Sequence, residues 1–246
     1  MSARRAGALL VGALVLVAAP ARAYRPFDET DADVSAFREI ELELGPVGLI
    51  HQPGGWTYAP GFIFNYGFWP RFELVVDAHD AFLFGGPDVA ARRRLLETGV
   101  LLKSVLRPGS LQGASGPSVA AELGALLPSV PAAGGAGGSL ALIVSQRWEN
   151  LTLHLNGEGD LTREGDRAFI ASVIVEGPDR WPLRPVAELL TAHQTNEPAT
   201  YSALGGAIWR ATEALSPDVA LRVAREAGEP VAEIRAGLTW AFSTRR

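Results

Sequence analysis

The run from Val231 to Phe242 constrains the fold of this chain most strongly. Its residues alternate with a period of two, which is the repeat of a β-strand. One face is apolar and ends in two aromatic residues: Ile234, Ala236, Leu238, Trp240 and Phe242. The other face is charged or small: Glu233, Arg235, Gly237, Thr239 and Ala241. This combination is typical of a transmembrane β-barrel, whose strands face lipid outside and water inside, with aromatic residues at the interface.

The first 23 residues have the pattern of a secretory signal peptide. Arg4 and Arg5 precede an almost purely apolar stretch over residues 6–19, and Pro20 interrupts it. The small residues of the Ala21-Arg22-Ala23 sequence then fit a signal-peptidase site. The stretch is too short for a transmembrane helix. We therefore predict export, with cleavage after Ala23.

Residues 24–35 follow this segment and lack any hydrophobic period. They contain four acidic residues, Asp28, Glu29, Asp31 and Asp33. We interpret this stretch as a solvated lead-in on the periplasmic side of the membrane.

Charge and cysteine content exclude several classes of function. Removal of residues 1–23 takes away three arginines and no acidic residue, so the formal charge falls from −5 to −8. An acidic chain is not expected to bind nucleic acid. The chain has no cysteine, so neither disulfides nor thiolate metal ligands are available. No later segment has 18 uncharged apolar residues in a row, so an inner-membrane helical protein is not expected.

The region over residues 36–44 shows the same alternation as the C-terminal run. Ile40, Leu42 and Leu44 share one face, and Glu39, Glu41 and Glu43 share the other. Three carboxylates on one face could not be buried in a dry core. They can face a water-filled lumen, and this favours a barrel over a soluble sheet.

The whole chain divides into twelve such segments, which predict an all-β fold: a transmembrane antiparallel β-barrel over residues 36–242 with a short tail over residues 243–246. An even number places both termini on one side, and connections after odd-numbered segments tend to be longer. The first and last segments should pair and close the barrel, with Glu233 and Arg235 beside the Glu39, Glu41 and Glu43 ladder. The segments cover residues 36–44, 57–68, 72–79, 95–106, 118–127, 139–147, 151–158, 167–176, 182–192, 201–210, 218–225 and 231–242.

Polar residues on the inner faces define the expected solute path. Acidic ones concentrate in the early strands and arginines in the late strands, which suggests a transverse field that would orient a dipolar solute. The lumen of a twelve-stranded barrel is intermediate in width between the filled interior of eight-stranded barrels and the open pore of sixteen-stranded porins. The sequence is therefore consistent with either a narrow open channel or an occluded lumen. The predicted lumen-lining residues are Glu39, Glu41, Glu43, Glu73, Asp77, Glu97, Lys103, Glu122, Arg147, His154, Asn156, Glu188, Arg210, Arg222, Glu233 and Arg235. Asn65, Glu176 and Arg184 share the same inner faces.

Catalytic and metal chemistry have little support in the sequence. The four histidines, His51, His79, His154 and His193, have no metal-ligand spacing. Ser145 could lie near His154 on an adjacent strand, as in an outer-membrane acyl hydrolase, but nothing resembles a nucleophile elbow. We predict no catalytic residue, no metal and no cofactor. A soluble lipocalin-like barrel is a further alternative, which would require apolar side chains inside.

Several short motifs resemble those of a known family. They are the segment from Pro117 to Pro128, a Gly-rich loop, Leu153-His-Leu-Asn156, Arg184-Pro-Val-Ala-Glu188 and Gly237-Leu-Thr-Trp-Ala-Phe242. In order and spacing they are similar to the outer-membrane β-barrel family labelled as the MetA-pathway phenol-degradation or transporter family. The resemblance spans about residues 36–242. It implies an outer-membrane barrel that passes small compounds, aromatic or hydrophobic ones included, and it implies no catalytic residue.

We therefore expect a cell outer-membrane channel or transporter for passive passage of a small-molecule solute. Its other partners would be outer-membrane lipid and the barrel-assembly machinery. That machinery usually reads a terminal aromatic residue, whereas Phe242 is followed by Ser243-Thr-Arg-Arg246. The alternatives are an occluded structural barrel without transport and an outer-membrane acyl hydrolase.

Overall fold

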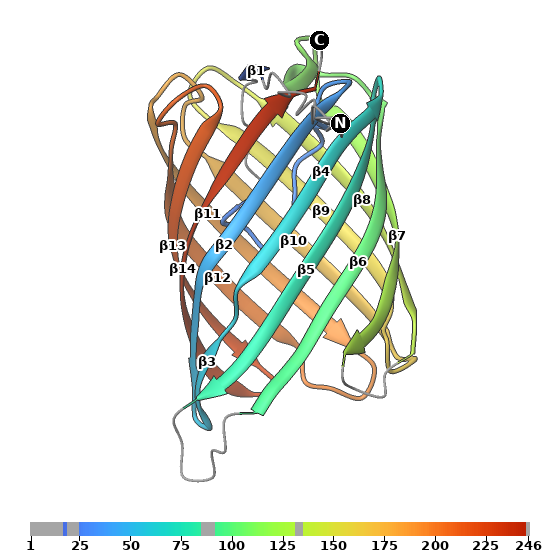
Figure 1. Cartoon of the computed structure of the whole chain (residues 1–246), viewed down its shortest axis with the longest axis vertical. Helices are drawn as coiled ribbons and strands as arrows, with labels where there is room; N and C mark the ends of the chain where they lie inside the picture. The colour runs from blue at the N-terminus through green and yellow to red at the C-terminus, as the bar shows by residue number, and fades with distance from the viewer. Residues whose placement is uncertain (1–16, 19–24, 85–91, 131–134, 245–246) are drawn as a thin grey trace, which may run out of the picture.

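The chain forms a closed antiparallel β-barrel, shown by a computed structural model that describes residues 17–18, 25–84, 92–130 and 135–244 (Figure 1). Twelve strands make up the wall. The prediction of an all-β barrel of about twelve strands is confirmed. Within the described residues, no helix is long and apolar enough to cross a membrane.

The wall strands follow one another around the barrel in sequence order, and each pairs with its neighbours. Two of them, β3 and β4, are the two halves of one interrupted wall strand that pairs with β2 on one side and β5 on the other. The strands are β2 (Glu39–Gln52), β3 (Gly55–Tyr58), β4 (Gly61–Trp69), β5 (Phe72–Phe84), β6 (Arg92–Arg107), β7 (Ser118–Val130), β8 (Gly137–Arg147), β9 (Thr152–Leu161), β10 (Arg167–Glu176), β11 (Leu183–Gln194), β12 (Thr200–Trp209), β13 (Leu215–Glu226) and β14 (Glu229–Ser243).

Pairing of β2 with β14 closes the barrel, as predicted. Both strands have their outer ends, Glu39 and Ser243, at the same end of the barrel, which we call the terminal end. Thr244 extends this seam, because its backbone N–H and its hydroxyl both donate to the carbonyl oxygen of Arg38. The first two residues of the tail after Phe242 are thus part of the closure, while residues 245–246 lie outside the described residues.

The predicted charge pairs at this seam are wrong. Arg235 lies opposite Gly48 and Glu233 opposite Ile50, whereas Glu43 lies opposite Thr239. The reason is that β2 continues through residues 45–52. We had interpreted this stretch as a connection because it is rich in glycine and proline. The longer strand moves the two charged residues of β14 away from the glutamate ladder.

The wall is irregular where β2, β3 and β4 meet. Pro60 separates β3 from β4, because proline has no N–H to donate to a sheet ladder. The break is bridged by the Ala59 N–H, which donates to the Gly48 carbonyl oxygen at 2.7 Å. A side chain at Gly48 would collide with the backbone oxygen of Ala59, so the close approach requires glycine. On the other edge of β2, the pairing with β14 shifts register between Ala236 and Leu238.

The barrel is polar inside and apolar outside. Glu41 on β2 is 2% exposed and Lys103 on β6 is 1% exposed, whereas Leu142 on β8 is 54% exposed and Leu221 on β13 is 62% exposed. A soluble barrel requires the reverse arrangement, so the lipocalin-like alternative is wrong. The outward apolar belt is the surface that a transmembrane barrel presents to lipid.

Aromatic side chains gather at the two ends of this belt. Five of the six tryptophans lie at the terminal end, in or beside its turns: Trp69, Trp148, Trp181, Trp209 and Trp240. The opposite end carries the exposed rings of Trp56, Phe84, Phe169 and Tyr201. Such girdles are typical of the two membrane–water interfaces of a barrel.

The remaining elements are small. Strand β1 (Val17–Ala18) pairs with Ser243 and Phe242. It lies in the segment predicted as a signal peptide, whose other residues are outside the described ranges, and cleavage after Ala23 stays a prediction. A 3-10 turn, η1 (Ser110–Gln112), lies in the connection between β6 and β7.

A charged side chain in the middle of the outer belt should destabilise the barrel. We expect Leu221→Arg to lower the free energy of unfolding by about 2–4 kcal/mol, because lipid cannot solvate the guanidinium. Leu161→Arg, at the end of β9 near the interface, should cost only about 0–1 kcal/mol. Equilibrium unfolding by guanidinium chloride in lipid vesicles measures both; equal losses would contradict this placement of the belt.

Candidate functional site: the barrel lumen

Residues 25–35 run inside the barrel and form what we call the inner segment (Figure 1). The sequence led us to expect solvated acidic residues here. Instead, Asp33 is buried together with Ala32 and Ser35, whereas Asp28 is exposed. The segment is polar because it packs against a polar wall.

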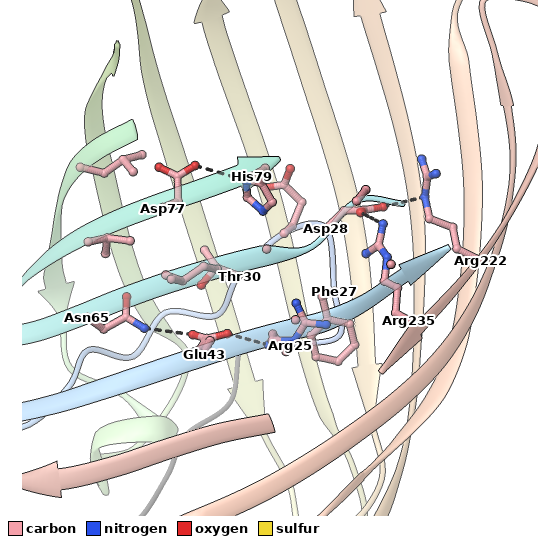
Figure 2. Close-up of a pocket in the computed structure, with 18 of the residues that line it drawn as sticks. Arg25, Phe27, Asp28, Thr30, Glu43, Asn65, Asp77, His79, Arg222 and Arg235 are labelled. Carbon is pink, nitrogen blue, oxygen red and sulfur yellow. Dashed lines mark hydrogen bonds and ion pairs between the residues drawn. The ribbon is translucent and has the colours of Figure 1, made fainter. Parts of the chain in front are cut away.

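Asp28 is held between two arginines that come from the last two strands (Figure 2). Its carboxylate accepts from Arg222 Nε at 2.9 Å and from Arg235 Nη2 at 2.6 Å. Both guanidinium groups also bind Glu233, at 3.6 Å and 2.8 Å. Two of the arginines predicted to line the lumen, Arg222 and Arg235, are therefore neutralised by a carboxylate of their own strand pair and by one from the inner segment.

The backbone of the inner segment donates hydrogen bonds to carboxylates of the wall. The N–H groups of Asp28 and Glu29 donate to the two oxygens of Glu188 on β11, at 2.7 and 3.2 Å. The Arg25 N–H donates to Glu43 on β2 at 3.1 Å. These bonds supply buried carboxylates with donors that the wall strands, whose own N–H groups pair within the sheet, cannot provide.

Lys103 and Glu73 bind the C-terminal half of the inner segment, residues 30–35. The Lys103 ammonium donates to the Thr30 hydroxyl at 2.9 Å and lies 3.8 Å from Asp31. Glu73 accepts from both the N–H and the hydroxyl of Ser35, at 2.9 and 2.5 Å. All but Thr30 and Asp31 are buried, so these charge-assisted bonds operate in a poorly solvated space.

A chain of hydrogen bonds links the segment to three consecutive wall strands. The Ala32 N–H donates to Ser145 Oγ on β8 at 2.9 Å, and Ser145 Oγ lies 2.8 Å from His154 Nδ1 on β9. His154 Nε2 lies 2.9 Å from Glu176 on β10. The arrangement is satisfied when His154 carries its proton on Nε2, donates it to Glu176 and accepts from the serine hydroxyl. Ser145 and His154, predicted only to be near one another, are thus in direct contact.

The connection between β6 and β7 covers this part of the segment. Gln112 Nε2 donates to the Ala32 carbonyl oxygen at 2.9 Å and to Asp33 Oδ1 at 3.0 Å. Leu111 packs in an apolar cluster with Ala32, Ala120 and Ile143. All four side chains are buried, which favours a fixed position for the segment over a loosely solvated one.

Glycines on three neighbouring strands make room for the side chain of Arg25. A side-chain carbon at Gly45 on β2 or at Gly237 on β14 would collide with the Arg25 guanidinium, and Gly61 on β4 borders the same space. The guanidinium lies 3.5 Å from the buried carboxylate of Asp218. Arg25 therefore occupies a niche in the wall that these glycines leave open.

A cavity of about 540 Å³ remains between the inner segment and the wall. Arg25, Phe27, Asp28, Glu29 and Thr30 of the segment line one side of it. The facing side comes mainly from β2, β4, β5, β6 and β7. Figure 2 shows Asn65, Asp77 and His79 on this facing side, across from the Asp28 arginine pair. The lumen is thus filled at the level of the segment and hollow beside it.

The predicted lumen residues do not form one continuous lining. Most are buried on the inner face: Glu39, Glu41, Glu43, Glu73, Lys103, His154, Asn156, Glu188, Arg222 and Glu233. Asp77, Glu122 and Arg235 border the cavity. Arg147 and Arg210 instead lie at the terminal end, where both approach Asp179, at 3.8 and 3.6 Å. Glu97 pairs with Arg163 at 3.8 Å, with its side chain 43% exposed. Whether these residues contact a solute stays a prediction.

Sequence reasoning missed three important inner residues. Arg25 and Asp28 belong to the segment read as solvated. Asp218 continues the inner face of its strand, at even spacing from Arg222, so the period of two could have found it. Glu158 shares the polar face of its strand with His154 and Asn156, as the alternation over residues 151–158 predicts. Among the described residues, no group of three or more His, Asp and Glu residues could hold a metal ion.

Comparison with solved structures places the fold among outer-membrane porins and channels. The chain is similar to the KdgM porin, with a TM-score of 0.58 and 12% identity over 82% of this chain and 98% of that one. It is similar to the NanC porin, with a TM-score of 0.60 and 9% identity over 81% and 98%. It is also similar to the COG4313 outer membrane channel from Pseudomonas putida F1, with a TM-score of 0.59 and 9% identity over 88% and 98%.

Identities this low show a shared fold and nothing finer. No protein-family model matches the sequence, and no curated protein matches it. The label of the MetA-pathway family therefore stays a prediction.

Removal of the Ser145 hydroxyl should loosen the inner segment. Ser145→Ala leaves the Ala32 N–H and His154 Nδ1 without partners, at a cost of about 1–3 kcal/mol. We expect amide hydrogen exchange at Ala32 to become faster by one to two orders of magnitude, since a loss of about 1.4 kcal/mol is a factor of ten. Ser202→Ala is the control, because no described contact joins this buried serine of β12 to the segment. Unchanged exchange at Ala32 would show that the serine does not hold the segment.

Proposed function

We propose that this chain is an outer-membrane β-barrel channel for passive passage of a small solute, and that its inner segment closes the lumen. The observation that carries the proposal is a polar, cavity-containing lumen inside a lipid-compatible wall. An apolar or fully packed interior would offer no path. The likeness of the fold to the KdgM and NanC porins and to the COG4313 channel supports a channel in general.

The two ends of the barrel can be assigned to the two sides of the outer membrane. Bacterial barrels with an even number of strands carry both termini on the periplasmic side. We infer that the terminal end faces the periplasm and that the five tryptophans there lie at the periplasmic interface. The protein would be exported, assembled by the barrel-assembly machinery and surrounded by outer-membrane lipid.

The charge of the lumen indicates the class of solute. One solved structure shows the KdgM porin in complex with disordered oligogalacturonate, an acidic ligand of that protein. The lumen of this chain is rich in carboxylates, and its arginines are already paired with acids. The family resemblance points instead to small aromatic or hydrophobic compounds. We therefore propose a small, non-acidic solute.

Opening requires the inner segment to move. Asp28 is the residue whose loss should favour this movement, because it binds both Arg222 and Arg235. We expect Asp28→Ala to raise single-channel conductance in planar lipid bilayers at least severalfold over the unsubstituted protein. Glu149→Gln, on an exposed turn with its side chain 83% exposed, should leave conductance unchanged.

The same recording tests the alternative of a structural barrel without transport. That alternative draws its support from the number of bonds that hold the inner segment. If Asp28→Ala and Ser145→Ala both leave the bilayer without conductance, while heat-modifiable gel mobility shows folded barrels, the channel proposal fails and the structural barrel stands.

The Ser145, His154 and Glu176 contacts raise the alternative of an acyl hydrolase. A nucleophilic serine needs a basic partner, which His154 provides, but it also needs access to substrate and donors for the oxyanion. Ser145 is fully buried, and the Ala32 N–H already donates to its oxygen. The geometry supports an anchoring role for this serine.

A labelling experiment separates the two roles. We expect a fluorophosphonate probe to leave Ser145 unmodified in the folded barrel, as judged by intact mass. The unsubstituted protein and Asp28→Ala should both be tested, since the second has the looser segment. A stoichiometric adduct that Ser145→Ala abolishes would instead establish a hydrolase site.

A further inference from the structure

We propose that the cavity beside the inner segment binds a small organic cation, an amine carried on an apolar body. This inference rests on the proposed channel function, because the cavity lies in the lumen that a solute would cross. It names the chemical class that the cavity would accept.

Carboxylates converge on one side of the cavity. Glu122 on β7 and Glu158 on β9 both lie opposite Ala141 on the intervening strand β8. Only the methyl group of Ala141 stands between them on the inner face. Glu29 of the inner segment borders the same space. Like charges brought together in a confined volume repel each other, and a bound cation removes that repulsion.

The arginines and the lysine of the lumen form ion pairs with acidic residues other than Glu122 and Glu158. Arg222 and Arg235 bind Asp28 and Glu233, and Arg25 lies beside Asp218. Lys103 lies 3.8 Å from Asp31 and is in register with both Glu73 and Glu122, so a single ammonium group serves several carboxylates. Among the described residues, no guanidinium pairs with Glu122 or Glu158.

Unpartnered acceptor atoms provide an independent indication. Asn65 lines the cavity and is 0% exposed. Its Nδ2 donates to Glu43 at 2.9 Å, while its Oδ1 has no hydrogen-bond partner among the described residues. Asp77 Oδ1, on the same side of the cavity, also has none. Buried acceptors without donors are costly, and a ligand that brings N–H donors satisfies them.

Apolar side chains complete the lining and suit a hydrocarbon body. Phe27 comes from the inner segment, and the wall contributes Ile63, Val75, Leu101 and Leu126. A volume of about 540 Å³ falls within the range of small-molecule pockets, roughly 300–1,000 Å³. A protonated alkylamine that carries an aromatic ring therefore matches the cavity in size, charge and polarity, whereas a carboxylate would meet acceptors and like charges.

Isothermal titration calorimetry on the purified full chain in detergent tests this class. Benzylamine is the probe, and benzyl alcohol and phenylacetate are its neutral and anionic counterparts with the same ring. We expect benzylamine to bind at least tenfold more tightly than either. Equal affinity for all three, or tighter binding of phenylacetate, would overturn the proposal.

Matched variants locate the binding. The double variant Glu122→Gln/Glu158→Gln keeps the size of both side chains and removes their charge, and it should weaken benzylamine binding at least tenfold. Glu149→Gln on the exposed turn should have no effect. Asp77→Asn provides a second variant if the double variant does not give a heat-modifiable, folded barrel. Unchanged binding in a folded variant of either kind would place the amine elsewhere and refute the site.

Liposome swelling of the Asp28→Ala and Ser145→Ala variants with the same three compounds distinguishes failure of the site from failure of the channel. Binding of benzylamine without any passage through either variant would refute the channel and leave the cation site intact. Passage of all three compounds at equal rates, with no preferential binding, would refute the cation site and leave the channel.

Discussion

The buried carboxylates of the inner wall need hydrogen-bond donors, and the rest of the lumen is arranged around that need. Strand N–H groups are used in the sheet, and the inner face carries few cations. The inner segment provides the missing donors through its backbone. Its N–H groups at residues 25, 28, 29 and 35 donate to Glu43, Glu188 and Glu73. A segment without fixed secondary structure can do this, because its own backbone groups are not paired internally.

The same requirement explains why the segment is acidic. Arg222 and Lys103 are buried and Arg235 is half-buried, and all three would be costly without counter-charges. Asp28 and Asp31 provide these charges from within the lumen. The wall and the segment thus provide each other with hydrogen-bond donors and counter-charges. Removing one partner leaves the other unsatisfied in a poorly solvated space.

The period of two predicted the wall well, because side chains facing lipid and lumen must alternate along every strand. Residues 167–176 were predicted as a strand and form β10 with the same bounds. The stretch through Gly45, Pro46 and Gly48 was missed, since these residues normally interrupt strands, yet here they allow the close approach of Ala59 and the niche for Arg25.

The lumen was harder to predict than the wall, because its contacts join residues far apart in the sequence. The contact between Asp28 and Arg235 spans 207 positions, and nothing local distinguishes an Asp28 paired inside the lumen from an unpaired one in bulk water. Short-range patterns report which face a residue occupies. They do not report that another part of the chain will fill the space in front of it.

The covalent link between the segment and the wall has a kinetic consequence. Only residues 36–38 separate Ser35 from the first residue of β2. A segment released from its partners therefore stays tethered to the mouth, at a high effective concentration. Reclosure is a unimolecular step whose rate does not depend on protein concentration, and the lifetime of an open lumen is set by the chain itself.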